Sequence, residues 1–180
     1  MNEAKEWIEA KEKGKKKTTS CCPAFKNYIE KHFPTLKDAI SETVSPMCAV
    51  SRYIKEKFPG AVTVFIGPCI AKKAESMSGE KNTADYALTY GEIRAMLRAK
   101  GVKLEPEEDT DDQGSIYGKK FANAGGVTAA VLESMKELGC TGDVSVCKCS
   151  GITECKKALT LMKVGRLPED FIEGMVCEGG

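Results

Sequence analysis

Residues 61–69 read AVTVFIGPC, a short apolar run that ends at a cysteine. β-Branched residues are frequent in 61–66, and the run is shorter than an ordinary helix, so it predicts a strand buried on both faces, as in a parallel sheet. Gly67 and Pro68 end the strand, and Cys69 follows directly. This stretch therefore predicts an α/β fold with a cysteine at the carboxyl end of a strand.

Helices and strands alternate on both sides of this stretch. A proline directly after a suitable capping position predicts helices at 22–33 and 45–57. Other helices are expected at 2–13, 92–100, 126–138 and 153–164, other strands at 85–90, 144–147 and 171–176, and a loop at 105–120. Such alternation predicts an α/β class with mostly parallel short sheets flanked by helices. In such sheets the binding crevice lies beyond the carboxyl ends of the strands, so Cys69 and Cys177 would both point into it.

Composition limits the class of protein. A length of 180 residues fits one domain or two small lobes. Lys and Arg total 27 against 26 Asp and Glu, which gives no electrostatic case for binding nucleic acid or a membrane. No segment approaches the ~20 apolar residues of a membrane span, and the first residues lack the apolar core of a signal peptide. We therefore expect a cytoplasmic protein. The chain has nine cysteines, an odd number, and in the reducing cytoplasm this favours metal binding or redox chemistry over disulfides.

Three cysteine segments carry the strongest chemical signal. They are TSCCP at 19–23, GPCIAKK at 67–73 and MVCEGG at 175–180, and proline or glycine flanks the cysteines in each. Thiolates select zinc, copper(I) or iron–sulfur clusters over hard cations. Because only a fold can bring such distant segments together, we expect a large metal cofactor buried between elements. Ordinary buried core cysteines are the alternative.

Neighbouring side chains diverge, so Cys21 and Cys22 cannot easily bind one metal together. One of the pair would be a ligand and the other would be free for acid–base chemistry. With Cys22 as the ligand, Cys69 and Cys177 complete a set of three, whereas a 4Fe–4S cluster usually takes four.

Other motifs have plainer readings beside the chemical ones. Cys147 and Cys149 fall on one face of a strand, which fits structural cysteines better than a zinc site or dithiol switch. Lys72 is either a hydrogen-bond donor to an anionic ligand or a solvated helix start. The glycine pair within 123–127 suits tight packing better than phosphate binding. His32 is the only histidine, which makes a Ser–His–Asp or Cys–His site improbable.

The three cysteine segments together resemble the catalytic H-cluster domain of the iron-only (FeFe) hydrogenases. That family carries TSCCP, PCxxKxxE and MxCxxGC signatures in this order, and here they correspond to 19–23, 68–75 and 175–180. The segment 123–127 is similar to the family's glycine pair before a helix. On this resemblance, 1–17 is an N-terminal helix and connector, and 18–180 is a partial H-cluster domain with two lobes around a cofactor cleft.

The resemblance implies a 4Fe–4S cluster joined through a cysteine thiolate to a di-iron site with carbon monoxide, cyanide and a bridging dithiolate amine. It implies reversible reduction of protons to dihydrogen, with a ferredoxin or ferredoxin-like domain as electron partner and maturation proteins that assemble the cofactor. The matching positions are Cys22, Cys69 and Cys177 as cluster ligands, Cys21 as the proton-passing thiol, Lys72 as a cyanide donor, Ser41 as a proton-path hydroxyl, and Met175, Gly67 and Pro68 beside the cofactor.

The sequence also departs from the family pattern. The family's fourth ligand would come directly after Gly180, and its upstream segment would lie before Met1, so we expect an inactive piece of a longer enzyme. The sequence leaves open whether this piece binds any cluster. Gly67 and Met47 differ from common family residues, and Glu3 and Glu6 are candidates for the proton path. We also expect exposed apolar surface at the ends to permit non-native dimers.

Two alternative functions follow. A sensory or scaffold iron–sulfur protein of the same family would bind a cluster without efficient turnover, although Cys21 favours catalysis. A zinc-binding or dithiol protein unrelated to hydrogen would bind no iron.

Overall fold

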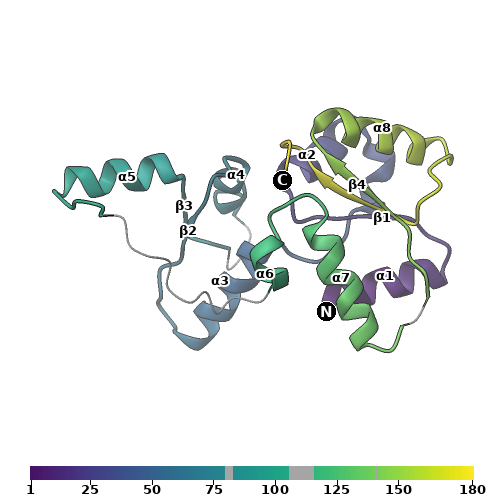
Figure 1. Ribbon diagram of the computed structural model, residues 1–180, viewed down its shortest axis with the longest axis horizontal. Helices are drawn as coiled ribbons and strands as arrows, with labels where there is room; N and C mark the ends of the chain where they lie inside the picture. Colours follow the sequence, from purple (N-terminus) through teal and green to yellow (C-terminus); the bar gives the residue numbers. More distant parts are fainter. Residues whose placement is uncertain (80–82, 106–115, 141) are drawn as a thin grey trace. The chain divides into compact units, whose positions relative to one another are not determined.

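The computed structural model describes residues 1–79, 83–105, 116–140 and 142–180 (Figure 1). The chain forms two compact units. Unit 1 combines Met1–Thr43 with Gly114–Gly180, and unit 2 is the continuous segment Val44–Gln113.

A three-stranded parallel sheet forms the centre of unit 1, in the order β1 (Lys17–Thr18), β5 (Phe171–Met175) and β4 (Val146–Ser150). β5 pairs with both neighbours, and all five of its residues are buried. This is the burial expected of a parallel sheet with helices on both faces.

Helices cover the two faces of this sheet, as Figure 1 shows. α2 (Pro23–His32) and α8 (Ile152–Lys163) pack on one face, and α1 (Asn2–Glu12) and α7 (Gly126–Glu137) pack on the other. The first face buries Phe25, Ile29, Cys149, Cys155, Leu159 and Ile172. The second face buries Ala4, Trp7, Val127, Val131, Phe171 and Met175.

α1 is a polar helix that is anchored by one aromatic contact. Trp7 is fully buried and stacks on Phe171 of β5, with ring centroids 4.3 Å apart. Offset or stacked aromatic pairs add stabilisation beyond the apolar area that they bury. This contact fixes α1 against the sheet, and with it Glu3, one turn before Trp7, and Glu6, directly before Trp7.

Unit 2 is a smaller α/β unit. It contains α3 (Pro46–Lys57), β2 (Val64–Ile66), α4 (Ala71–Ser76), β3 (Tyr86–Leu88) and α5 (Tyr90–Ala99), with β2 and β3 paired in parallel. The predicted proline starts are confirmed: Ser45 caps α3 by accepting a hydrogen bond from the Cys48 N–H, and Pro46 is the first helical residue. Thr89 and Glu92 form a capping box at the start of α5.

The mixed helix and parallel-sheet α/β class is confirmed, with corrections to individual elements. The expected strand 61–66 is paired only at 64–66, and Val64 and Ile66 are each 47% exposed, so the prediction of burial on both faces was wrong. A two-stranded sheet has too few neighbours to cover both faces.

Further differences concern other elements. The strand expected at 144–147 runs from Val146 to Ser150, because its register follows β5. The loop expected at 105–120 contains a short helix, α6 (Ile116–Lys120), and the rest of it from 106 to 115 lies outside the described residues. The two-residue strand β1 and the 3-10 helix η1 (Pro34–Ala39) had not been predicted.

In the part of the chain that the structure describes, no helix has both the length and the apolar composition that crossing a membrane requires.

Candidate metal centre

The signature cysteines sit at the ends of elements, as the sequence predicted. Cys22 is the N-cap of α2 with extended backbone angles, and it is half-buried. Cys177 follows β5 and is exposed, and Cys69 lies between β2 and α4 and is half-buried. Cys22 and Cys177 belong to unit 1, and Cys69 belongs to unit 2. The expected ligand set therefore draws on both units.

The donors fit an iron–sulfur cluster by their chemistry. None of the nine cysteines, all of which lie in the described part of the chain, forms a disulfide, and thiolates are the ordinary ligands of such clusters. Within the described residues, no group of three His, Cys, Asp or Glu side chains is arranged to hold a single metal ion. The donors present are thus separate thiols on turns rather than a compact site of the zinc-finger kind.

Close backbone contacts hold the turn that carries Cys177. The N–H of Ala124 donates to the Gly179 carbonyl at 3.0 Å, and the N–H of Gly179 donates to Ser150 Oγ at 2.8 Å. A Cβ atom built at Gly180 would lie 2.1 Å from the Ala122 carbonyl oxygen, so only glycine fits there. The Cys177 turn is therefore pinned to the 122–124 turn and to β4.

Cys21 has an environment that keeps it a thiol. Burial raises its pKa to about 12, and the nearby Glu3 and Glu173 carboxyl groups add to the effect. Desolvation and negative charge both disfavour a thiolate.

A carboxylate and a hydroxyl lie directly together in the same unit. Ser41 Oγ donates to Glu6 Oε2 at 2.6 Å, and Ser41 is 5% exposed. Glu6 also accepts from the Glu42 N–H at 3.1 Å and from Thr43 Oγ1 at 3.3 Å. Glu3 is three residues before Glu6 on α1 and is 8% exposed. A spacing of three makes the two residues neighbours on the surface of α1, about one turn apart.

The two carboxyl groups have opposite acidities. Burial raises the Glu3 pKa to about 7, with a further rise from Glu6 and Glu173. Burial would also raise the Glu6 pKa, but hydrogen bonds from Ser41 and Lys17 outweigh it and lower that pKa. Paired groups whose environments separate their acidities are typical of proton-transfer sites, though also of structural networks.

Lys72 is buried in unit 2, 8% exposed, rather than solvated. Its Nζ atom lies 2.6 Å from Glu75 Oε2, three residues further along α4. Of the other expected site residues, Met175 is buried in β5, Gly67 is buried, and Pro68 is exposed. The Gly67 N–H donates to the Leu88 carbonyl at 3.1 Å, which ties the turn before Cys69 to β3.

The glycine pair before α7 has a structural role. The Gly125 and Thr128 N–H groups each donate to a carboxylate oxygen of Glu173 at 2.9 Å, and Glu173 is fully buried. A carboxylate at a helix N-terminus satisfies the unpaired N–H groups and the helix dipole. The preference for packing over phosphate binding is confirmed. The sequence analysis missed Glu173, although one acidic residue inside an apolar strand was a signal.

Lys17, Cys48 and Thr83 were also missed as site neighbours. Lys17 Nζ lies 2.9 Å from Glu6 Oε1, and no local pattern relates these positions.

Cys147 and Cys149 do share one strand face, with sulfur atoms 3.8 Å apart. Their thiols pack in or beside the core between the sheet and α8, which supports the structural reading.

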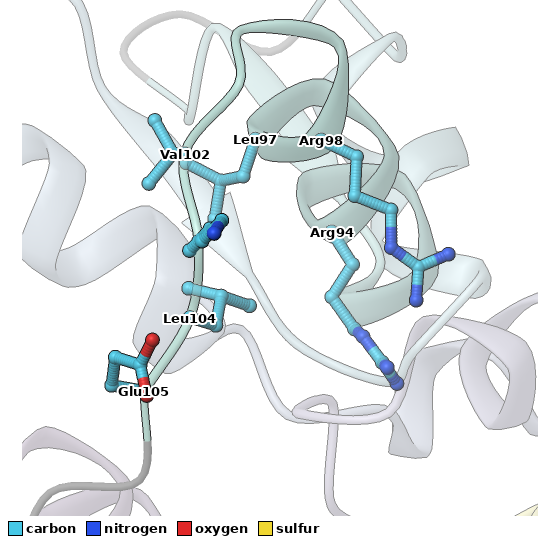
Figure 2. Close-up of a pocket in the computed structure, with 7 residues that line it drawn as sticks. Arg94, Leu97, Arg98, Val102, Leu104 and Glu105 are labelled. Atoms are coloured by element: carbon cyan, nitrogen blue, oxygen red, sulfur yellow. The ribbon is translucent and has the colours of Figure 1, made fainter.

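Unit 2 also carries a groove between α5 and the segment that follows it. Figure 2 shows Leu97 of α5 facing Val102 and Leu104, with Arg94 and Arg98 extending from the same helix. Lys103 and Glu105 complete the lining. The groove contains none of the expected site residues.

The sequence is similar to those of known hydrogenases. The family model described as "Iron only hydrogenase large subunit, C-terminal domain" matches residues 1–180. The periplasmic Fe hydrogenase large subunit of Nitratidesulfovibrio vulgaris is 29% identical over 208 residues, which cover 90% of this chain and 49% of that protein. The NADP-reducing hydrogenase subunit HndD of Solidesulfovibrio fructosivorans is 29% identical over 144 residues, 69% of this chain and 24% of that subunit.

Solved structures show the same fold. A structure of the FeFe-hydrogenase HydA(deltaEFG) has a TM-score of 0.68 at 21% identity, covering 98% of this chain and 64% of that one. A structure of apo HydA1 from Chlamydomonas reinhardtii has a TM-score of 0.67 at 21% identity, with the same coverage. The chain spans about half the length of the periplasmic relative.

Fold and cysteine segments together define an α/β domain of the hydrogenase class. Since the family model matches the whole chain, this protein belongs to the iron-only hydrogenase large-subunit family, in its C-terminal domain.

Proposed function

We propose that this chain is part of an iron-only hydrogenase that reversibly reduces two protons, with two electrons from a ferredoxin-type donor, to dihydrogen. The observation that carries the proposal is the Ser41–Glu6 hydrogen bond of 2.6 Å, with buried Glu3 one turn away in the same unit as Cys21. When bound, a 4Fe–4S cluster with a di-iron unit would supply the site where protons and electrons combine.

In this proposal, Cys22, Cys69 and Cys177 hold the cluster, and Lys72 donates a hydrogen bond to a cyanide ligand. Met175, Gly67 and Pro68 shape the surroundings. Maturation proteins would deliver the di-iron unit. The family membership supports these assignments, and the free thiols at the ends of elements fit them.

The chain's own residues would move the proton. Glu6, whose side chain is 19% exposed, exchanges a proton with Ser41 along the 2.6 Å bond. Glu3 would take up that proton, and Cys21 would pass it to the reacting centre and regain one from Glu3. A hydroxyl suits the middle position because it donates and accepts at once.

Anaerobic reconstitution with iron and sulfide tests the proposal. We expect a reducible 4Fe–4S signal in electron paramagnetic resonance, which Cys22→Ala, Cys69→Ala and Cys177→Ala each remove. Cys140→Ala is the matched control, because Cys140 is half-buried beside the core of unit 1 and is not an expected ligand. Binding of zinc without iron would overturn the proposal and favour a zinc or dithiol protein.

One observation favours the sensory or scaffold alternative. Lys17 binds Glu6 at 2.9 Å, and the lowered pKa of Glu6 makes it a weaker proton acceptor. Slow proton exchange would suit cluster binding without efficient turnover. Hydrogen evolution by the matured full-length protein, compared with its Lys17→Met variant, distinguishes the two functions: a large gain in rate would indicate that Lys17 restrains turnover.

A further inference from the structure

A buried polar network in unit 2 lies behind Lys72. Cys48 of α3 is fully buried, and its Sγ atom lies 3.4 Å from Glu75 Oε1 and 3.1 Å from Thr83 Oγ1. Thr83, just before β3, is 6% exposed. Three separate segments, which are α3, α4 and the approach to β3, therefore meet at one thiol.

The Glu75 carboxylate is held through both of its oxygens. Oε2 accepts from Lys72 Nζ at 2.6 Å, and Oε1 accepts from the Cys48 thiol at 3.4 Å. A carboxylate bound on one side only can rotate about its terminal torsion, which is broad. The contact with Cys48 therefore restricts the rotation of the Glu75 carboxylate. It thereby fixes the position of the oxygen that Lys72 Nζ binds.

Lys72 needs such a restraint because lysine has a long stem with four rotatable bonds, and ordering it costs side-chain entropy. α4 has only six residues, so the helix itself gives little support. α3 is better anchored, since Ser45 caps it and Lys55 binds the Thr83 carbonyl at 2.9 Å and Asp85 Oδ1 at 2.8 Å.

We propose that Cys48 and Thr83 are positioning residues that act through Glu75 to fix the Lys72 ammonium group. The proposal rests on the proposed function, in which Lys72 donates to a ligand of the cofactor. Cys48 transmits the rigidity of α3 to α4, so a change at this thiol alters where Lys72 can donate without removing any group that touches the cofactor.

The test is competitive reductive methylation of lysines with formaldehyde and cyanoborohydride, followed by mass spectrometry, on the chain without iron. The extent of Lys72 labelling is divided by that of Lys100, which is exposed and therefore reports how much reagent was available. Lys55 is the in-unit control because its ammonium group is also bound, to Asp85. We expect Glu75→Gln and Cys48→Ala to raise Lys72 labelling about fivefold, the factor for one lost hydrogen bond. Thr83→Val should raise it less.

Cys48→Ser separates positioning from packing. Serine restores a donor to Glu75, but its oxygen is smaller than sulfur and fills the buried site less well, so restored protection of Lys72 supports the proposal. Two results overturn it: parental Lys72 labelling in Cys48→Ala, or equal rises at Lys72 and Lys55 that Cys48→Ser does not reverse. The labelling experiment needs no cluster, so a negative result there counts only against the positioning role of Cys48 and Thr83. A failure to bind iron would instead overturn the proposed function.

Discussion

Glu3 and Glu6 show how the fold gives two identical side chains different chemistry. Both lie on α1, but Trp7 holds the helix so that Glu3 faces the buried side beside Cys21 and Glu173. Glu6 instead faces the chain from Ser41 to Thr43, whose polar groups donate to it. Desolvation dominates at the first position and hydrogen bonding at the second.

We predict that Glu3→Gln changes stability in a pH-dependent way. The unfolded chain loses the Glu3 proton near pH 4.5, while the folded chain keeps it to about pH 7. Folding therefore binds a proton in this window, and the free energy of unfolding falls as the pH rises through it, by about 3 kcal/mol. Glutamine resembles the protonated form, so the variant should match the parent at pH 4 and exceed it at pH 8.

Urea unfolding followed by the fluorescence of Trp7, the one tryptophan in the sequence, measures this difference. Burial contributes most to the raised Glu3 pKa, the Glu6 and Glu173 carboxyl groups add to it, and the amino terminus and the Trp7 side chain oppose it. Glu9→Gln on the exposed side of α1 is the control and should show no such pH dependence. An equal stability difference at pH 4 and pH 8 would contradict the prediction.

We predict that Lys17→Met raises the pKa of Glu6. The Lys17 and Glu6 side chains are 15% and 19% exposed, so solvent screens their 2.9 Å ion pair only partly. The parental Glu6 contributes stability above its unfolded pKa that is lost as pH falls through its lower folded pKa. Without the Lys17 cation, Glu6 should contribute less stability above its unfolded pKa, so less stability is lost as the pH falls.

Titration of the Glu6 carboxyl carbon by NMR measures the change, and Lys17→Arg should keep the pKa low. Lys13→Met removes an exposed ion pair with Glu9 on the same helix and is the control. No shift in Lys17→Met would mean that Ser41 and the backbone N–H alone set the acidity of Glu6.

At the level of single residues, the sequence predicted the chemistry better than the contacts. Proline and glycine flanks identified the cysteine positions, because those residues mark the ends of elements. The Ser41–Glu6 contact spans 35 positions, and Cys48–Thr83 also spans 35. Such contacts depend on how helices pack, which local patterns do not encode.

Elements were predictable where their ends carry strong local signals. α3 begins at a serine–proline pair and α2 at a cysteine–proline pair, and both were placed within one residue. β1 has only two residues, both polar, and exists because β5 offers it a partner. β4 begins two residues later and ends three residues later than expected, because its register follows β5 rather than its own apolar pattern.

We predict that Gly126→Ala strongly destabilises unit 1. A Cβ atom at Gly126 would lie 1.9 Å from the Lys120 carbonyl oxygen and 2.8 Å from the Lys120 carbonyl carbon, and backbone atoms cannot move aside as a side chain can. The cost should reach at least about 3 kcal/mol, the upper end for overpacking. It would also displace the start of α7, where Glu173 is bound.

Urea unfolding monitored by Trp7, which packs in the same core as α7, measures this loss. Gly142→Ala is the matched control, because nothing lies within 4 Å of its added Cβ atom and its backbone is not left-handed. Similar stability of the two variants would show that the 120–126 turn can rearrange.

On the scale of the whole molecule, charge gives little protection against association at neutral pH. The formal net charge is +1 and the isoelectric point is about 7.4, so repulsion between molecules is weak near that pH. Unit 2 exposes several large apolar side chains, namely Val64, Ile66, Ile70, Met77 and Tyr86. Of these, Val64 and Ile66 lie on β2 and Tyr86 pairs with Val64 on β3, and contiguous exposed apolar surface promotes association.

We predict that replacing Val64 and Ile66 together by threonine reduces association at pH 7.4. Threonine keeps the β-branched shape that suits β2, so its pairing with β3 should persist. Each parental side chain is 47% exposed, so little buried contact is lost. Light scattering against concentration should show a smaller increase for the double variant than for the parent. The difference should narrow at pH 5, where net positive charge keeps both proteins apart. Equal scattering at pH 7.4 would mean that association uses another surface, and a Val50→Thr variant on the exposed side of α3 would then be the next to measure.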